Sequence, residues 1–143
     1  MTYLLDTNVV SEGMKTRPEP RVVAWFLEHR AAEVYMSTLT LGELVRGARK
    51  HPDEGKRRVL ETWIRDDLAR QFKGRILPFD AEAAVMWGDL LAAGDQAGLR
   101  LPAVDAQIAA VARRHGMTVV TRNVRDFSLM NVPLLNPWSE QGG

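Results

Sequence analysis

The segment that decides the fold is Tyr3-Leu4-Leu5-Asp6-Thr7-Asn8, close to the start of the sequence. Its first half is a short apolar run typical of a buried strand, and a carboxylate follows this run at once. Similar apolar runs occur at 34–37, 75–78 and 118–121, and a weaker one lies at 132–135. The runs predict five short strands. The last should lie at a sheet edge, because Pro133 cannot donate a ladder hydrogen bond.

Segments with helical spacing of apolar residues separate these strands. Pro20 opens the first, Asp80 is a good N-cap, and Gly116 is a good C-terminal stop. The predicted helices span 20–30, 41–50, 56–72, 81–93 and 103–115. Apolar strands that alternate with helices predict an α/β domain whose parallel sheet is covered on both faces. In such sheets ligands bind beyond the carboxyl ends of the strands, where the strand order reverses.

Composition narrows the class of protein. The chain has 143 residues, which fits one domain over residues 1–143, and its 45% apolar content argues against disorder. It has no cysteine, which excludes disulfide scaffolds, thiolate zinc sites and cysteine nucleophiles. The first residues do not form a signal peptide, and no apolar run is long enough to span a membrane. We therefore expect a cytoplasmic protein.

Acidic residues lie where the binding rule for parallel sheets points. Asp6 follows the first strand, and the segment 121–123 follows the fourth, with Asp126 three residues beyond Asn123. Asp105 is expected in the first turn of the helix that leads into the fourth strand. Glu43 is expected in the first turn of the helix after the second strand. If the first and fourth strands are neighbours, all these side chains face one crevice.

Each acid also has a purely structural interpretation. Asp6 is a suitable N-cap, and Thr40 with Glu43 has the form of a capping box. Asp105 would complement a helix dipole, and Asp126 would suit a turn. The functional interpretation therefore depends on the placement of the whole set and not on any single member.

The chemistry expected of such a set is metal-dependent phosphodiester hydrolysis. Clustered carboxylates repel one another unless a cation joins them, and hard oxygen ligands select Mg²⁺, or Mn²⁺ as a substitute. Asn8 and Thr121 are candidates for orienting the carboxylates. Candidates for binding RNA phosphates are four arginines in two basic stretches: Arg46, Arg49, Arg122 and Arg125.

Other chemistries fit less well. The sequence has no glycine-rich phosphate loop and no GxSxG elbow. The histidines, His29, His51 and His115, are predicted to be ordinary surface residues. An aspartate-nucleophile phosphatase needs a second Asp where Asn8 stands, and a receiver domain needs an acidic pair where Leu5 precedes Asp6. Assays for covalent phosphorylation would separate both classes from a nuclease.

The ordered set of motifs resembles the PIN-domain family, and more narrowly the VapC and FitB toxins of bacterial toxin–antitoxin pairs. The motifs cover nearly the whole chain, and as an ordered set they are specific. They are LLDTNVVSE at 4–12, STLTLGEL at 37–44, GRILPFD at 74–80, AVDAQIA at 103–109, VTRNVRDF at 120–127 and NPW at 136–138.

The resemblance implies a three-layer α/β/α sandwich with a parallel five-stranded sheet in the order 3-2-1-4-5. It implies a Mg²⁺-dependent endoribonuclease toxin acting on tRNA or other structured RNA, and a homodimer. It also implies a cognate VapB- or FitA-like antitoxin, which would bring operator DNA binding to the complex. The alternative is a catalytically weak PIN domain that acts mainly as an RNA- or partner-binding module in such a complex.

The resemblance also assigns roles to residues. Asp6, Glu43 and Asp105 match the family's acidic positions and are the expected metal ligands and catalytic residues. The fourth position is left open between Asn123, which keeps an oxygen ligand but loses a charge, and Asp126, which supplies that charge.

Overall fold

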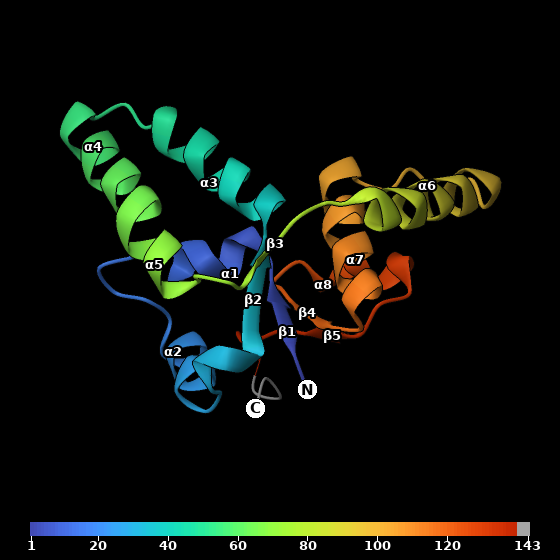
Figure 1. The fold of residues 1–143 in the computed structure, drawn as a ribbon, viewed down its shortest axis with the longest axis horizontal. Coiled ribbons are helices and arrows are strands. Elements are labelled where there is room, and N and C mark those ends of the chain that lie inside the picture. The colour runs from blue at the N-terminus through green and yellow to red at the C-terminus, as the bar shows by residue number, and fades with distance from the viewer. Residues whose placement is uncertain (140–143) are drawn as a thin grey trace.

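A parallel sheet of five strands, in the order β3-β2-β1-β4-β5, forms the centre of the computed structural model, which describes residues 1–139 (Figure 1). The five predicted strands and the order implied by the family resemblance are both confirmed. The strands are β1 Tyr3–Leu5, β2 Val34–Ser37, β3 Ile76–Leu77, β4 Thr118–Val120 and β5 Leu134–Leu135.

Strand register places the segments that follow the strands at one edge. Leu5 pairs with Met36 of β2 on one side and with Val120 of β4 on the other. The carboxyl ends of these three strands therefore lie level. Asp6 and Thr121 come one residue later, on neighbouring strands, as expected for a shared crevice.

Helices cover both faces of the sheet, which makes three layers (Figure 1). On one face, Leu5 of β1 packs with Val9, Trp25 and Leu44. On the other face, Leu4 packs with Ile108 and Phe127. The first face is covered by α1 Thr7–Glu12, α2 Pro20–Leu27, α3 Thr38–Arg49, α4 Glu54–Thr62 and α5 Ala69–Gln71. The second is covered by α6 Ala81–Gln96, α7 Ala103–His115 and α8 Val124–Phe127.

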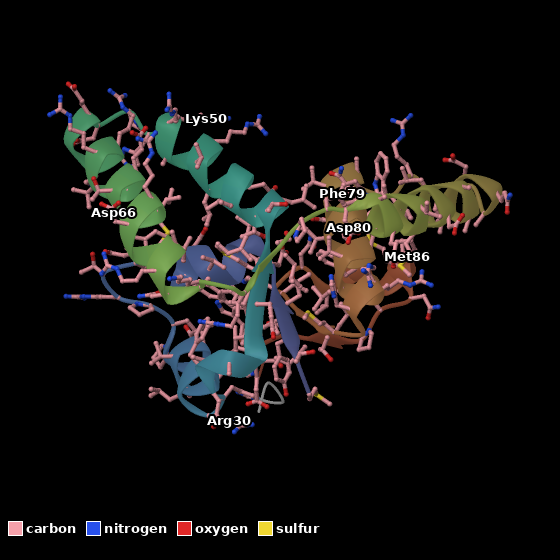
Figure 2. The ribbon with its side chains drawn as sticks, in the orientation of Figure 1. Arg30, Lys50, Asp66, Phe79, Asp80 and Met86 are labelled. Atoms are coloured by element: carbon pink, nitrogen blue, oxygen red, sulfur yellow. The ribbon has the colours of Figure 1, made fainter. Side chains whose placement is uncertain are left out.

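The side chains of the two helical layers can be followed in Figure 2. Lys50 and Asp66 lie on the side of α3 to α5, whereas Asp80 and Met86 lie on the side of α6. None of the helices in residues 1–139 is both long enough and apolar enough to cross a lipid bilayer.

The predicted helices differ from the observed ones mainly at their boundaries. The helix predicted at 103–115 is found with those bounds, and the helix predicted at 56–72 is continuous from α4 to α5 through a π-helical segment, Trp63–Leu68. Two short helices, α1 and α8, begin within a few residues of the ends of β1 and β4 and were not predicted. Short 3₁₀ turns at Ala31–Glu33 and Ser128–Met130 complete the structure of this part of the chain.

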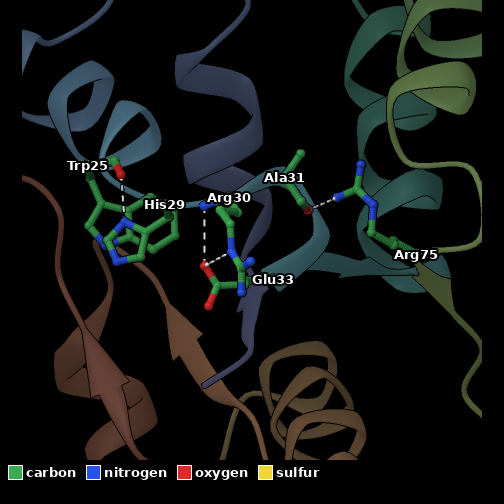
Figure 3. A network of polar contacts seen from close by, with 6 residues as sticks. All are labelled: Trp25, His29, Arg30, Ala31, Glu33 and Arg75. Atoms are coloured by element: carbon green, nitrogen blue, oxygen red, sulfur yellow. Dashed lines mark hydrogen bonds and ion pairs between the residues drawn. The ribbon is translucent and has the colours of Figure 1, made fainter.

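A polar network closes the amino edge of the sheet, opposite the acidic segments (Figure 3). The Arg75 guanidinium donates to the carbonyl of Ala31 at 2.6 Å and also to the carbonyls of Val34 and Gln71. His29 stacks on Trp25 with ring centroids 4.4 Å apart, and its Nδ1 lies 2.7 Å from the Trp25 carbonyl oxygen. The prediction that His29 is an ordinary surface residue is therefore wrong, because its ring is part of an aromatic cluster.

The Arg75 network generates a stability prediction. Arg75→Met should lower the free energy of unfolding by about 2–3 kcal/mol, because it removes a charged donor from three carbonyls. Arg58→Met is the matched control: Arg58 pairs with Glu54 at 3.1 Å on an exposed surface. That change should cost less than about 1 kcal/mol. Urea unfolding measures both variants, and equal losses would contradict the structural role of Arg75.

Candidate active site

Asp6 is a buried acid at the carboxyl edge of the sheet, with 5% of its surface exposed. It is the N-cap of α1, and its Oδ1 accepts a hydrogen bond from the Thr7 amide at 2.8 Å. Its Oδ2 accepts from the Thr121 hydroxyl at 2.8 Å and from Asn8 Nδ2 at 3.3 Å. Asp6 is therefore a helix cap and, at the same time, a bridge between the ends of β1 and β4.

Thr121 and Asn8 hold the two strand ends together around Asp6. Thr121 is fully buried, and its Oγ1 also accepts a hydrogen bond from the Asn123 amide at 2.9 Å. Asn8 Oδ1 accepts from the Arg122 amide at 3.3 Å. The segment after β4 is thus positioned by side chains of the segment after β1, and both candidate orienting residues contact Asp6 directly.

Glu43 does not belong to a capping box, so that interpretation is wrong. The N-cap of α3 is Ser37, whose hydroxyl accepts from the Thr40 amide at 3.3 Å. Because the helix begins at Thr38, Glu43 lies in its second turn, and not in the first turn as predicted. Its Oε1 accepts a hydrogen bond from the Thr7 hydroxyl, which links it to the residue next to Asp6.

Thr7 is a site residue that the sequence analysis missed. Its hydroxyl oxygen also lies 3.3 Å from the hydroxyl oxygen of Thr40, which is buried. The available signal was its position directly after Asp6, at the start of a helix. A side chain there faces the same crevice as the carboxylate.

Asp105, Asn123 and Asp126 form the other side of the site. Asp105 lies in the first turn of α7, as predicted, and Asp126 lies in the first turn of α8. Asn123 Nδ2 donates to Asp105 Oδ2 at 3.3 Å and to Asp126 Oδ2 at 2.9 Å. Both candidates for the fourth position are therefore at the site, joined through one amide group.

The electrostatics show that these carboxylates share one environment. Burial, together with the nearby charges of Asp6, Asp126 and Glu43, raises the pKa of Asp105 to about 6, and burial is the largest cause. Burial also raises the pKa of Asp6, against the opposing effect of the hydrogen bonds from Thr121 and Thr7. Ionised carboxylates at this edge are therefore destabilised by desolvation and by mutual repulsion.

The oxygen atoms of these side chains are chemically suited to bind a hard cation. Carboxylate oxygens are the ligands that Mg²⁺ and Mn²⁺ prefer, and a bound cation would offset the repulsion that raises the pKa of Asp105. Within residues 1–139, no three acidic or histidine side chains are already arranged as a complete ligand set. The carboxylates are instead held by protein donors, from Thr7 on Glu43 to Asn123 on Asp105.

The four arginines predicted to bind RNA have different surroundings. Arg46 and Arg125 are exposed, near the ends of α3 and α8. Arg49 forms an ion pair with Glu61 at 3.4 Å. The guanidinium of Arg122 lies over the ring of Trp138, 5.1 Å from its centroid. Arg122 directly follows Thr121, whose hydroxyl donates a hydrogen bond to Asp6.

Comparison with known proteins decides the family. A family model described as PIN domain matches residues 3–131. The chain belongs to the PIN-domain family. It is 36% identical to toxin FitB of Neisseria gonorrhoeae, over 96% of this chain and 99% of that protein. It is 33% identical to a VapC ribonuclease of Sinorhizobium fredii, over 94% of this chain and 96% of that protein.

Solved structures agree with this assignment. The crystal structure of FitAcB from Neisseria gonorrhoeae matches this PIN domain with a TM-score of 0.90 at 36% identity, covering 96% of this chain and 99% of that one. A structure of FitAB bound to a DNA fragment also has a TM-score of 0.90 at 36% identity, covering 98% of each chain. The arrangement of strands and helices around the acidic edge is therefore the one found in these toxins.

The raised pKa of Asp105 predicts how stability depends on pH. Because the pKa is higher in the folded state, the fold favours the neutral carboxyl. That stabilisation is full below the unfolded pKa of about 4 and is lost as pH rises through about 6. In metal-free buffer at pH 8, Asp105→Asn should therefore raise the free energy of unfolding by about 1–2 kcal/mol, a value reduced for partial solvent exposure.

Urea unfolding in EDTA at pH 8 and pH 5 measures this effect, and the gain should shrink at the lower pH. Asp66→Asn is the control, since Asp66 is exposed on the π-helical segment and is not among the charges that raise the pKa of Asp105. It should change stability little at either pH. An Asp105→Asn protein that is no more stable than the parent at pH 8 would show that the carboxylate is not destabilised there.

Proposed function

We propose that this PIN domain is a Mg²⁺-dependent endoribonuclease, the toxin of a toxin–antitoxin pair. The observation that carries the proposal is the meeting of Asp6 and Asp105, with Glu43, at the carboxyl ends of neighbouring strands. The membership of this chain in the PIN-domain family and its similarity to a VapC ribonuclease support the ribonuclease activity. Its similarity to toxin FitB supports the toxin role.

In the proposed metal site, the role of each acid follows from its position. Asp6 and Asp105 would be direct ligands of Mg²⁺, with Mn²⁺ as a substitute. Glu43, which is exposed, would bind through water or orient the attacking water. Asn123 or Asp126 would complete the site. When bound, the metal lowers the pKa of a coordinated water and stabilises negative charge on the phosphoryl oxygens.

The other polar residues keep the acids in place. Thr121 and Asn8 fix the Oδ2 atom of Asp6, and Thr7 fixes Glu43 from the adjacent position. Such hydrogen bonds set the direction of a carboxylate and the atom that it presents to a ligand. Glu43 is then the acid best placed to take a proton from water, because it is exposed, whereas Asp105 and Asp126 are half-buried and Asp6 is buried.

RNA would be bound mainly through its phosphates. Arg122, Arg125, Arg46 and Arg49 supply positive charge around the acidic edge, although Arg49 must share its charge with Glu61. Phosphate contacts of this kind give affinity and salt dependence with little sequence choice. The substrate class we propose is tRNA or other structured RNA in the cytoplasm.

A cognate antitoxin and a second copy of the chain would complete the assembly. The solved relatives are FitAB complexes, one of them on DNA. A formal net charge of +1 gives this chain no strong general attraction to DNA. Operator binding is therefore proposed for a VapB- or FitA-like antitoxin partner in the complex, with this chain contributing as a homodimer.

Removal of single carboxylates tests the ribonuclease. Asp6→Asn and Asp105→Asn should each lower Mg²⁺-dependent cleavage of RNA by about 100-fold or more, because charge stabilisation of this kind contributes on that scale. Circular dichroism should show the fold retained, and Asp66→Asn should cleave like the parent. Full activity in both active-site variants would remove the assignment.

Calorimetric titration tests the metal site separately from activity. Mg²⁺ and Mn²⁺ should bind the parent protein and the Asp66→Asn control alike, and Asp105→Asn should lose about 10-fold or more in affinity, because one charged ligand is gone. If the parent binds neither ion at this edge, the alternative is favoured, that of a weakly catalytic PIN domain that mainly binds RNA or a partner.

A further inference from the structure

Trp138 is held firmly beside the acidic edge, although it lies near the end of the chain. Its carbonyl accepts a hydrogen bond from the Arg21 guanidinium at 2.7 Å, and its amide donates to Asn136 Oδ1 at 2.9 Å. The side chain is half-buried and packs against the apolar core of the first face. An aromatic plane fixed in this way is a preformed surface for stacking.

Arg122 connects this plane to the acidic site. Its guanidinium lies 5.1 Å from the centroid of the Trp138 ring, and its amide donates to Asn8 Oδ1. The preceding residue, Thr121, donates to Asp6. Arg122, the cation of the Arg122–Trp138 pair, is therefore the neighbour in sequence of the residue that holds the central carboxylate.

A surface cleft of about 450 Å³ opens in front of this pair. Its lining contains three cations, Lys15, Arg17 and Arg122, and two acids, Glu12 and Glu19. Glu12 is 5% exposed, and its carboxylate already binds Lys15 Nζ at 2.8 Å and the Glu19 amide at 2.8 Å.

The cations of this cleft leave room for an anionic ligand. Across residues 1–139, neither Arg17 nor Arg122 forms an ion pair, whereas Lys15 is engaged by Glu12. An anion in the cleft would thus meet two guanidinium groups beside an aromatic ring. The volume of the cleft falls in the range of small-molecule binding sites in proteins.

We propose that this cleft binds one unpaired nucleotide of the RNA, next to the cleaved bond. The base would stack on the Arg122–Trp138 pair, and its phosphate would meet Arg17 and the edge of the Arg122 guanidinium. Unpaired bases are recognised by stacking on aromatic rings and guanidinium planes, whereas the bases of a duplex are not available for it. The proposal rests on the ribonuclease function, because it takes RNA as the substrate.

The combination of features favours a nucleotide over an acidic peptide. Guanidinium groups alone would serve either ligand. The aromatic plane beside them suits a base, and Arg122 directly follows Thr121, which contacts Asp6, as suits a chain whose phosphates must pass through that site. A protein ligand is therefore treated as an outcome of the test.

RNA binding in EDTA tests the cleft without cleavage. Fluorescence anisotropy of a labelled single-stranded oligoribonucleotide and of its duplex form gives the dissociation constants. Trp138→Leu should weaken single-strand binding by about 10-fold, in line with the loss of one stacked base. Trp138→Phe, which keeps an aromatic plane, should remain within about 3-fold of the parent. Duplex binding should change little in either variant.

A second variant, Arg122→Met, keeps the test decisive if Trp138→Leu does not fold. It too should weaken single-strand binding more than duplex binding. The proposal is overturned if these variants bind the single strand like the parent, or lose single-strand and duplex binding equally. Unchanged RNA binding with weakened binding of the cognate antitoxin would also overturn it, and would assign the cleft to a protein.

The two proposals can fail separately. If the parent protein does not cleave RNA but the two variants selectively lose single-strand binding, the nucleotide cleft is supported and the ribonuclease function is rejected. If the protein cleaves RNA but Trp138→Leu and Arg122→Met leave single-strand binding unchanged, the nucleotide cleft is rejected and the ribonuclease function stands.

Discussion

The site depends on one contact, the hydrogen bond that the Thr121 hydroxyl donates to Asp6 Oδ2 at 2.8 Å. Thr121, the donor, is fully buried. The contact exists because β1 and β4 pair in parallel and end level, and the Asp6 amide itself donates to the Val120 carbonyl at 2.9 Å. A slip of one residue in this register would turn Asp6 toward the other face of the sheet. The strand pairing therefore fixes where the central carboxylate stands.

Around that contact the fold brings together carboxylates whose charges repel one another. Burial and neighbouring carboxylates raise the pKa of Asp105 to about 6, so its ionised form lowers the stability of the folded chain near neutral pH. Neutral donors limit the loss: Thr7 binds Glu43, and the Asn123 amide bridges Asp105 and Asp126. An amide at position 123 can join these two carboxylates by donating a hydrogen bond to each, whereas a carboxylate there would repel them.

Much of this arrangement follows from sequence, and the failures have local causes. Short apolar runs predicted all the strands, and the family resemblance implied their order. The capping-box interpretation of Thr40 and Glu43 failed because Ser37, three residues earlier, caps α3. Thr7 was missed because α1 is too short to show periodicity, and the contact of Arg122 with Trp138 depends on the tertiary fold.

The central claim is that the carboxylates of Asp6 and Asp105 form one cation site at the ends of β1 and β4. The most direct measurement is the anomalous scattering of crystals of the protein grown with Mn²⁺. The account predicts a peak between these two carboxylates, within about 2.5 Å of an oxygen of each, the upper end of ordinary metal–oxygen distances. Mn²⁺ bound elsewhere on the chain, with the Asp6 and Asp105 carboxylates left without metal at saturating concentration, would contradict it.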